Sequence, residues 1–156
     1  MFSSLREGIA FPPLLKKVEL MKKLMNVLLW LWQLPQNLLG LAFMLFLRPL
    51  RRVETDIETI ATVYVSERMS GGISLGDYAY VSRISSRDEK TIRHEGIGHP
   101  RQSRMLGPLY LPVIGLPSLL HAWLNGAIDC CDRHPEGYYH FYTESWADRL
   151  GGVKRQ

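Results

Sequence analysis

Apolar residues gather in two long stretches of this chain. Residues 24–47 carry no charged side chain, and neither do residues 105–128. The first stretch is long enough for a bilayer-spanning helix. It contains Pro35, however, which lacks a backbone N–H and clashes with the preceding turn of a helix. The pattern therefore predicts two helical halves of about 11 and 12 residues, joined at a break.

Three arrangements of this broken stretch remain open. It forms one kinked transmembrane helix, a re-entrant hairpin, or two helices that lie on a membrane or pack on the rest of the protein. Trp30 and Trp32 suit a membrane–water interface. Basic residues flank both ends and favour a hairpin that returns to the same side. They are Lys16, Lys17, Lys22 and Lys23 on one flank, and Arg48, Arg51 and Arg52 on the other.

The chain divides by these patterns into three parts. Residues 1–23 predict a basic lead-in, open to disorder, in which Phe11-Pro12-Pro13 breaks any helix. Residues 24–53 predict an apolar, membrane-associated helical segment. Residues 54–156 carry the alternating and helical patterns of a separate domain.

The pattern of that domain predicts a mainly helical α+β fold. Residues 55–66 predict a short helix that passes into β-branched residues. Residues 73–76 and 78–81 predict a short hairpin or small sheet that turns at Gly76-Asp77. Residues 138–150 predict a helix that stops at Gly151-Gly152.

Two further helical stretches complete the domain. Residues 88–102 begin with charged residues and continue as a helix, and residues 118–125 predict a second helix. In the second apolar stretch, Pro108, Pro112 and Pro117 argue against one continuous transmembrane helix.

The net charge and the positions of the basic residues indicate which kinds of partner the protein binds. The net charge is +4 and the pI is about 9.2, and the basic residues cluster beside the first apolar stretch. No segment alternates aromatic and basic residues as RNA-binding segments do. This distribution favours contact with anionic lipid headgroups and predicts no nucleic-acid partner.

Two short motifs hold the residues with the clearest chemistry. The first is His94-Glu95-Gly96-Ile97-Gly98-His99, and the second runs from Glu144 to Asp148 as Glu-Ser-Trp-Ala-Asp. Two histidines and one glutamate are a common ligand set for catalytic zinc. A glutamate beside the first histidine is suited to act as a general base.

These motifs resemble those of the gluzincin group of zinc metallopeptidases. The resemblance implies that His94, His99 and Glu144 bind Zn²⁺, that Glu95 is the catalytic base, and that Asp148 holds a ligand histidine. It implies a gluzincin-like domain over residues 54–156, with zincin-like helices carrying the motifs and a peptide or protein substrate.

A second resemblance covers a larger part of the chain. The residues after His99, the C-terminal segment and residues 32–40 (Trp-Gln-Leu-Pro-Gln-Asn-Leu-Leu-Gly) are similar to those of small membrane-associated bacterial proteins. This similarity implies a bacterial protein that is associated with membrane lipid, and it names neither a substrate nor a side of the membrane.

The spacing of the histidines departs from the usual motif. A four-residue spacing leaves both side chains on one helix face, whereas His94 and His99 are five apart and would lie about 140° apart on a regular helix. A π-bulge can absorb the extra residue, because Gly96 and Gly98 tolerate unusual backbone angles. Pro100 opposes a helical His99, so alternatives are a loop-borne His99 or a site that binds no metal.

Simpler interpretations of each candidate residue stay open. Glu144 can be an ordinary surface residue, and Asp148 can pair with Arg149 or Lys154. His140 lies four residues before Glu144 and is a reserve ligand. His121 is more typical of a core or interfacial histidine. A weaker metal cluster would use Cys130, Cys131 and His134.

Two functions follow from these motifs. The first is a membrane-associated zinc hydrolase that cleaves a peptide or amide bond with a metal-activated water. The second is a catalytically inactive gluzincin-derived membrane protein with a binding or structural role. Stoichiometric zinc and the effect of replacing Glu95 distinguish them.

Overall fold

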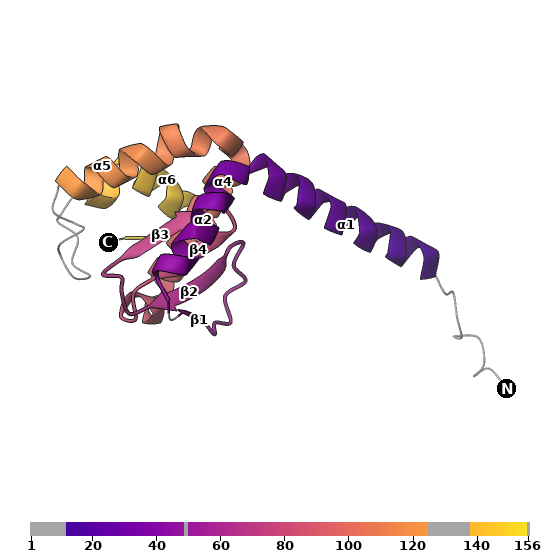
Figure 1. The fold of residues 1–156 in the computed structure, drawn as a ribbon, viewed down its shortest axis with the longest axis horizontal. Helices are drawn as coiled ribbons and strands as arrows, with labels where there is room; N and C mark the ends of the chain where they lie inside the picture. Colours follow the sequence, from indigo (N-terminus) through magenta and orange to yellow (C-terminus); the bar gives the residue numbers. More distant parts are fainter. Residues whose placement is uncertain (1–11, 49, 125–137, 156) are drawn as a thin grey trace.

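The computed structural model describes residues 12–48, 50–124 and 138–155. These residues form a mainly helical α+β fold with a small mixed sheet, as the sequence predicts (Figure 1). The strands are β1 (Leu50–Arg52), β2 (Thr62–Ser66), β3 (Gly72–Leu75) and β4 (Tyr78–Val81). The α-helices are α1 (Pro12–Trp32), α2 (Leu34–Phe46), α3 (Glu89–Arg93), α4 (His99–Leu106), α5 (Leu116–Leu124) and α6 (Tyr142–Gly151).

The sheet has the strand order β1-β2-β4-β3. β3 and β4 form the predicted antiparallel hairpin, and the turn between them uses Gly76 at φ 66°. β2 and β4 pair in parallel, with Val63 opposite Ala79. β1 adds an antiparallel strand that the sequence analysis missed. β3 is therefore an edge strand.

Helices cover both faces of the sheet, and successive side chains of β4 point to opposite faces. Ala79 and Val81 join Ile92 of α3 in the hydrophobic core on one face. On the other face, the hydroxyl of Tyr80 donates a hydrogen bond of 2.6 Å to the carbonyl of Gly40 in α2. The motif-bearing helices and α2 thus lie on opposite sides of a thin sheet.

The start of α1 corrects one expectation. The helix begins at Pro12, so the part of the basic lead-in from residue 12 to residue 23 is helical and does not lack structure. Proline suits the first helical turn, because N–H groups there have no partner within the helix. Residues 1–11 lie outside the described part.

The predicted break near Pro35 is confirmed. α1 ends at Trp32, α2 begins at Leu34, and the two axes bend by 84°. Three buried polar residues, Gln33, Gln36 and Asn37, lie at this bend and form what we call the polar joint. The side chain of Asn37 accepts from the Asp77 N–H at 2.8 Å and so ties the bend to the β3–β4 turn.

Neither apolar stretch contains a single membrane-spanning helix by length and composition among the described residues. Two bent pairs of helices pass that test only when each pair is taken together. The first is α1 with α2, and the second is residues 89–109 with residues 111–124, which bend by 119°. The second stretch is thus interrupted at Tyr110, near Pro108, whereas Pro112 and Pro117 lie within the helical run of residues 111–124.

The predicted helix at residues 55–61 is wrong. The hydroxyl of Thr55 accepts a hydrogen bond from the Ile57 N–H at 3.1 Å, which is a local turn that competes with a helix. The N–H groups of Ile60 and Ala61 donate to the carbonyl of Gly96 instead of to a helical partner. The β-branched residues at the end of this segment form β2.

Candidate metal centre

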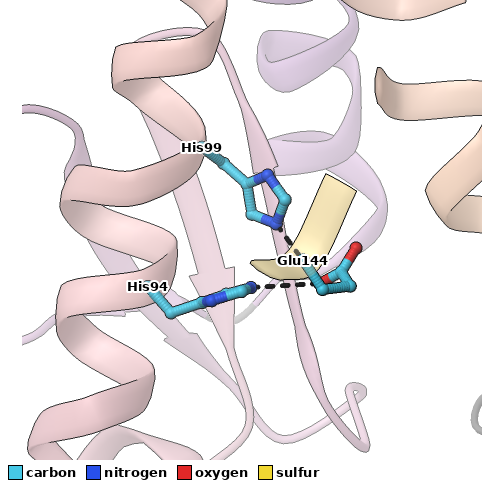
Figure 2. Close-up of side chains that lie close together, drawn as sticks. All are labelled: His94, His99 and Glu144. Carbon is cyan, nitrogen blue, oxygen red and sulfur yellow. Dashed lines mark hydrogen bonds and ion pairs between the residues drawn. The ribbon is translucent and has the colours of Figure 1, made fainter. Parts of the chain in front are cut away.

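The extra residue between the motif histidines forms a π-turn. Residues His94–Gly98 are π-helical between α3 and α4, and the N–H of His99 donates to the carbonyl of His94. This i to i+5 bond brings residues five apart close to one full turn, so both imidazoles project to the same side. Figure 2 shows His94 and His99 pointing from one helix toward Glu144.

Pro100 does not prevent His99 from being helical, contrary to the expectation from the sequence. His99 has φ −61° and ψ −39°, so it is helical. Pro100 and the π-turn release two carbonyls from helical bonding. The carbonyl of Gly96 accepts from Ile60 and Ala61 at 2.8 and 3.0 Å, and that of Glu95 accepts from the Ser74 hydroxyl at 2.8 Å. Partners outside the helix thus satisfy the buried groups that the distortion frees.

Glycine allows α6 to approach this turn closely. A Cβ on Gly98 would overlap the carbonyl oxygen of Ala147, and one on Gly151 would lie 2.7 Å from the Arg93 carbonyl oxygen. The backbones of the two motifs therefore pack directly against each other. Glu144 and Asp148 are one turn apart on α6, so both side chains reach the π-turn.

Three candidate ligand atoms converge in the interior. His94 Nε2 lies 3.1 Å and His99 Nε2 lies 3.6 Å from the Glu144 Oε2 atom. All the ligand atoms of this group lie within 4.8 Å of one another, and all three residues are buried. Ligands of a tetrahedral zinc ion are about 3.3 Å apart at ordinary Zn–N and Zn–O distances. The group therefore fits a metal ion of that size.

Each histidine is held through its other ring nitrogen. His94 Nδ1 lies 2.6 Å from Asp148 Oδ1, and His99 Nδ1 lies 2.7 Å from Gln102 Oε1. The amide of Gln102 donates in turn to the Thr143 carbonyl at 2.8 Å, which fixes its oxygen toward His99. Both Nδ1 atoms thus face an acceptor, and both Nε2 atoms face Glu144.

Asp148 and Glu144 have further partners. Arg155 donates to Asp148 Oδ2 at 2.7 Å, and its guanidinium lies 3.2 Å from the ring centre of Tyr139. The second oxygen of Glu144 accepts from the Ser118 hydroxyl of α5 at 2.5 Å. The expected alternatives, in which Asp148 pairs with Arg149 or Lys154 and Glu144 is a surface residue, do not describe this structure.

The electrostatics of the group follow from these contacts. Burial alone would lower the pKa of His94, but hydrogen bonds to Asp148 and Glu144 outweigh it and raise that pKa to about 10. Burial raises the pKa of Glu144, but hydrogen bonds to His94 and His99 hold it well below its usual value. The two carboxylates thus favour positive charge at this point, which suits a divalent cation.

Glu95 lines the same cavity as His94 and Glu144. The cavity has a volume of about 300 Å³ and is also lined by Gly72, Tyr138, Tyr139 and Arg155. The Ser74 hydroxyl lies 2.5 Å from Glu95 Oε2, and a Cβ on Gly72 would overlap the same carboxylate. The edge strand β3 therefore holds the Glu95 side chain in place, and no side chain larger than that of glycine fits at position 72.

The other sequence candidates lie elsewhere. His140 is exposed, in a short 3₁₀ turn before α6, and is not part of the ligand group. His121 stacks on Phe141 with ring centres 4.2 Å apart, as expected of a packed histidine. The proposed cluster of Cys130, Cys131 and His134 lies outside the described residues.

Sequence reasoning missed residues that hydrogen-bond to the candidate site residues Glu95, His99, Glu144 and Asp148, among them Ser74, Gln102, Ser118 and Arg155. The contact of Gln102 with His99 could have been predicted from the sequence, because side chains three residues apart on a helix are neighbours. The other three come from separate elements, and nothing in their local sequence marks them.

Comparisons with protein-family models, curated proteins and solved structures find no match for this chain. The buried group of His94, His99 and Glu144 is therefore the finding on which a functional argument must rest.

Proposed function

We propose that this protein is a membrane-associated zinc hydrolase that cleaves a peptide or amide bond. The observation that carries the proposal is the convergence of His94 Nε2, His99 Nε2 and Glu144 Oε2 at one buried point. Two imidazoles and one carboxylate suit zinc but also other divalent ions. The gluzincin-like motifs and the carboxylate of Glu95 beside this group favour zinc and hydrolysis.

Different residues would bind the ion and hold its ligands in position. His94, His99 and Glu144 would hold the ion, while Asp148 and Gln102 fix the two imidazoles. A bound zinc ion supplies Lewis acidity, which polarises a carbonyl and makes water a stronger acid.

Glu95 is the proposed general base. Its carboxylate accepts a proton from the water that attacks the carbonyl carbon, as a new C–O bond forms. It returns this proton to the leaving nitrogen when the C–N bond breaks. The Ser74 hydroxyl holds the carboxylate in one orientation for both transfers, and Gly72 leaves the space that the carboxylate occupies.

The membrane part of the proposal has separate support. The described helices carry many exposed apolar side chains, and basic residues flank the first apolar stretch. Lipid and a peptide or protein substrate are then the partners of a bacterial membrane-associated enzyme.

The proposal is tested with Glu95→Gln, which keeps the size of the side chain and removes its basicity. The zinc-loaded full chain is incubated with a peptide library, and cleavage is read by mass spectrometry with and without a chelator. Chelator-sensitive cleavage should fall by about 10²–10⁴-fold in Glu95→Gln, while zinc content is unchanged. The control is Glu58→Gln, because Glu58 is exposed and lies outside the cavity.

Equal cleavage by Glu95→Gln and the unmodified chain would contradict the role of Glu95. Stoichiometric zinc without any cleavage would favour the second function, a catalytically inactive protein in which the same group serves binding or structure.

A further inference from the structure

Exposed apolar side chains are concentrated on one set of helices. Among the described residues, all the exposed large hydrophobic side chains except Ile84 and Tyr142 lie between residues 15 and 46 or between residues 105 and 124. We call these two segments together the apolar surface. Water-soluble monomers rarely expose a continuous apolar patch of more than a few hundred Å². Something other than water is expected to cover it.

α5 illustrates how complete this exposure is. Its outward residues lie within a sector of about 140° on a regular helix; they are Leu116, Leu119, Leu120, Trp123 and Leu124. Trp123 is 66% exposed and Leu124 is 75% exposed. The opposite face holds Ser118, which bonds to Glu144, and His121, which stacks on Phe141. This is the reverse of the polarity of a surface helix in a water-soluble protein.

α1 has the pattern of a helix that lies in a membrane interface. It projects from the body of the molecule (Figure 1) and is about 31 Å long at the usual rise. Five of its six polar residues fall within a sector of about 120°; they are Lys16, Glu19, Lys22, Lys23 and Asn26, and Lys17 lies outside this sector. Apolar residues occupy most of the remaining circumference. An apolar face beside a lysine-rich one is typical of interfacial helices.

The polar joint fixes the two bent helix pairs side by side. Gln36 donates to the Ser103 hydroxyl and to the Gly107 carbonyl, both at 2.9 Å. The indole of Trp32 donates to the Arg104 carbonyl at 3.2 Å. The side-chain amide nitrogens of Gln33 and Gln36 are thus bonded within the protein, whereas their Oε1 atoms are buried without a hydrogen-bond partner among the described residues. The two halves of the apolar surface are therefore held as one unit.

The charges around α1 and α2 favour lipid over a second copy of the chain. Residues 12–52 contain seven basic residues and one acidic residue. The lysines lie between residues 16 and 23 of α1, and Arg48, Arg51 and Arg52 follow the end of α2. Pairing two copies through these helices would bring like charges together, whereas anionic headgroups would neutralise them.

We propose that the apolar surface inserts into one leaflet of a bilayer that contains anionic phospholipid, with both ends of the α1–α2 pair at the headgroups of the same side. The 84° bend and the basic residues at both ends favour a return to the starting side over a crossing. This inference rests on the membrane part of the proposed function and not on the metal chemistry.

Flotation with phospholipid vesicles tests the surface. The full chain should bind vesicles of phosphatidylcholine with phosphatidylglycerol, and should bind pure phosphatidylcholine more weakly. The double variant Leu119→Glu with Trp123→Glu should lose at least about tenfold in partitioning, since each change removes buried apolar area and adds a charge. Ile84→Glu is the matched control, because Ile84 is equally exposed but lies outside the apolar surface. Circular dichroism of both variants checks that each is folded.

Fluorescence quenching tests the depth. Lipids brominated near the headgroup should quench the tryptophans more strongly than lipids brominated at the chain ends, and Trp123→Phe should reduce that quenching. Strongest quenching from the bilayer centre would overturn insertion into one leaflet. The lipid surface itself is overturned by equal binding of all variants, by no binding to either vesicle, or by a detergent-free dimer that shields Trp123. His94→Ala should bind vesicles as the unmodified chain does, so a failure of the proposed metal site can be distinguished from a failure of the proposed lipid surface.

Discussion

The neighbouring helices α5 and α6 present opposite kinds of surface. α6 turns Thr143, Glu144 and Asp148 into the protein, and each of them has a hydrogen-bond partner there. α5 turns its leucines and Trp123 outward, where the described residues leave them exposed. The comparison teaches that polarity alone does not tell which face of a helix is buried. The inner face of α6 carries part of a buried group that could hold a metal ion, and the outer face of α5 is apolar.

The two helices are also connected through one hydrogen bond. Ser118 belongs to α5 and donates to Glu144 of α6 at 2.5 Å. The helix with the exposed apolar face thus contacts a candidate metal ligand directly, and variants on either helix can separate the two proposed roles.

The largest effect is expected where α6 packs on the π-turn. Gly98→Ala should destabilise the protein by about 2–3 kcal/mol, because the new Cβ overlaps the Ala147 carbonyl and forces the helices apart. A glycine-to-alanine change in an unhindered helix would instead stabilise by about 1 kcal/mol. Urea unfolding in detergent measures the difference. Gly71→Ala is the control, since nothing lies near its added Cβ, and an increase in stability for Gly98→Ala would refute the close packing.

An intermediate effect is expected at Gln102. Gln102→Met removes the acceptor for the His99 Nδ1 proton and should weaken zinc binding by about 10–100-fold. Gln102→Glu keeps an acceptor at that position and should retain most of the affinity. Competition with a chromophoric chelator measures both. Unchanged affinity in the methionine variant would mean that His99 needs no support from this side.

The smallest effect is expected at the link between the two helices. Ser118→Ala removes one donor to Glu144 and should weaken zinc binding about three- to tenfold, as expected for one lost hydrogen bond. Vesicle binding should not change, because Ser118 faces away from the apolar surface. Ser145→Ala is the matched control, since its hydroxyl contacts only the Tyr142 carbonyl among the hydrogen bonds described. A loss of vesicle binding in Ser118→Ala would show that the two roles are not separable.

Local signals in the sequence were enough for much of the fold. The break at Pro35, the β3–β4 hairpin and the stop at Gly152 each depend on residues within a few positions of one another. The start of α1 was missed because proline has opposite effects in the first turn and in the interior of a helix. The helix expected at residues 55–61 was overridden by long-range bonds to Gly96.

The candidate site shows the same limit. The residues of the two motifs could be named from their order, and Gly96 and Gly98 indicated how five-residue spacing is accommodated. Their convergence depends on contacts that are distant in sequence, such as Ser74 with Glu95 and Ile60 with Gly96. No local pattern predicts that Ser118 contacts Glu144 or that Arg155 contacts Asp148.

The π-turn and α6 together carry the residues of the proposed metal site. The most direct measurement is the zinc content of the purified full chain by elemental mass spectrometry, beside His94→Ala and His140→Ala. The account predicts about one zinc per chain, lost in His94→Ala and kept in His140→Ala, because His140 is exposed and outside the ligand group. No zinc in the unmodified chain after supplementation, or equal zinc in both variants, would contradict it.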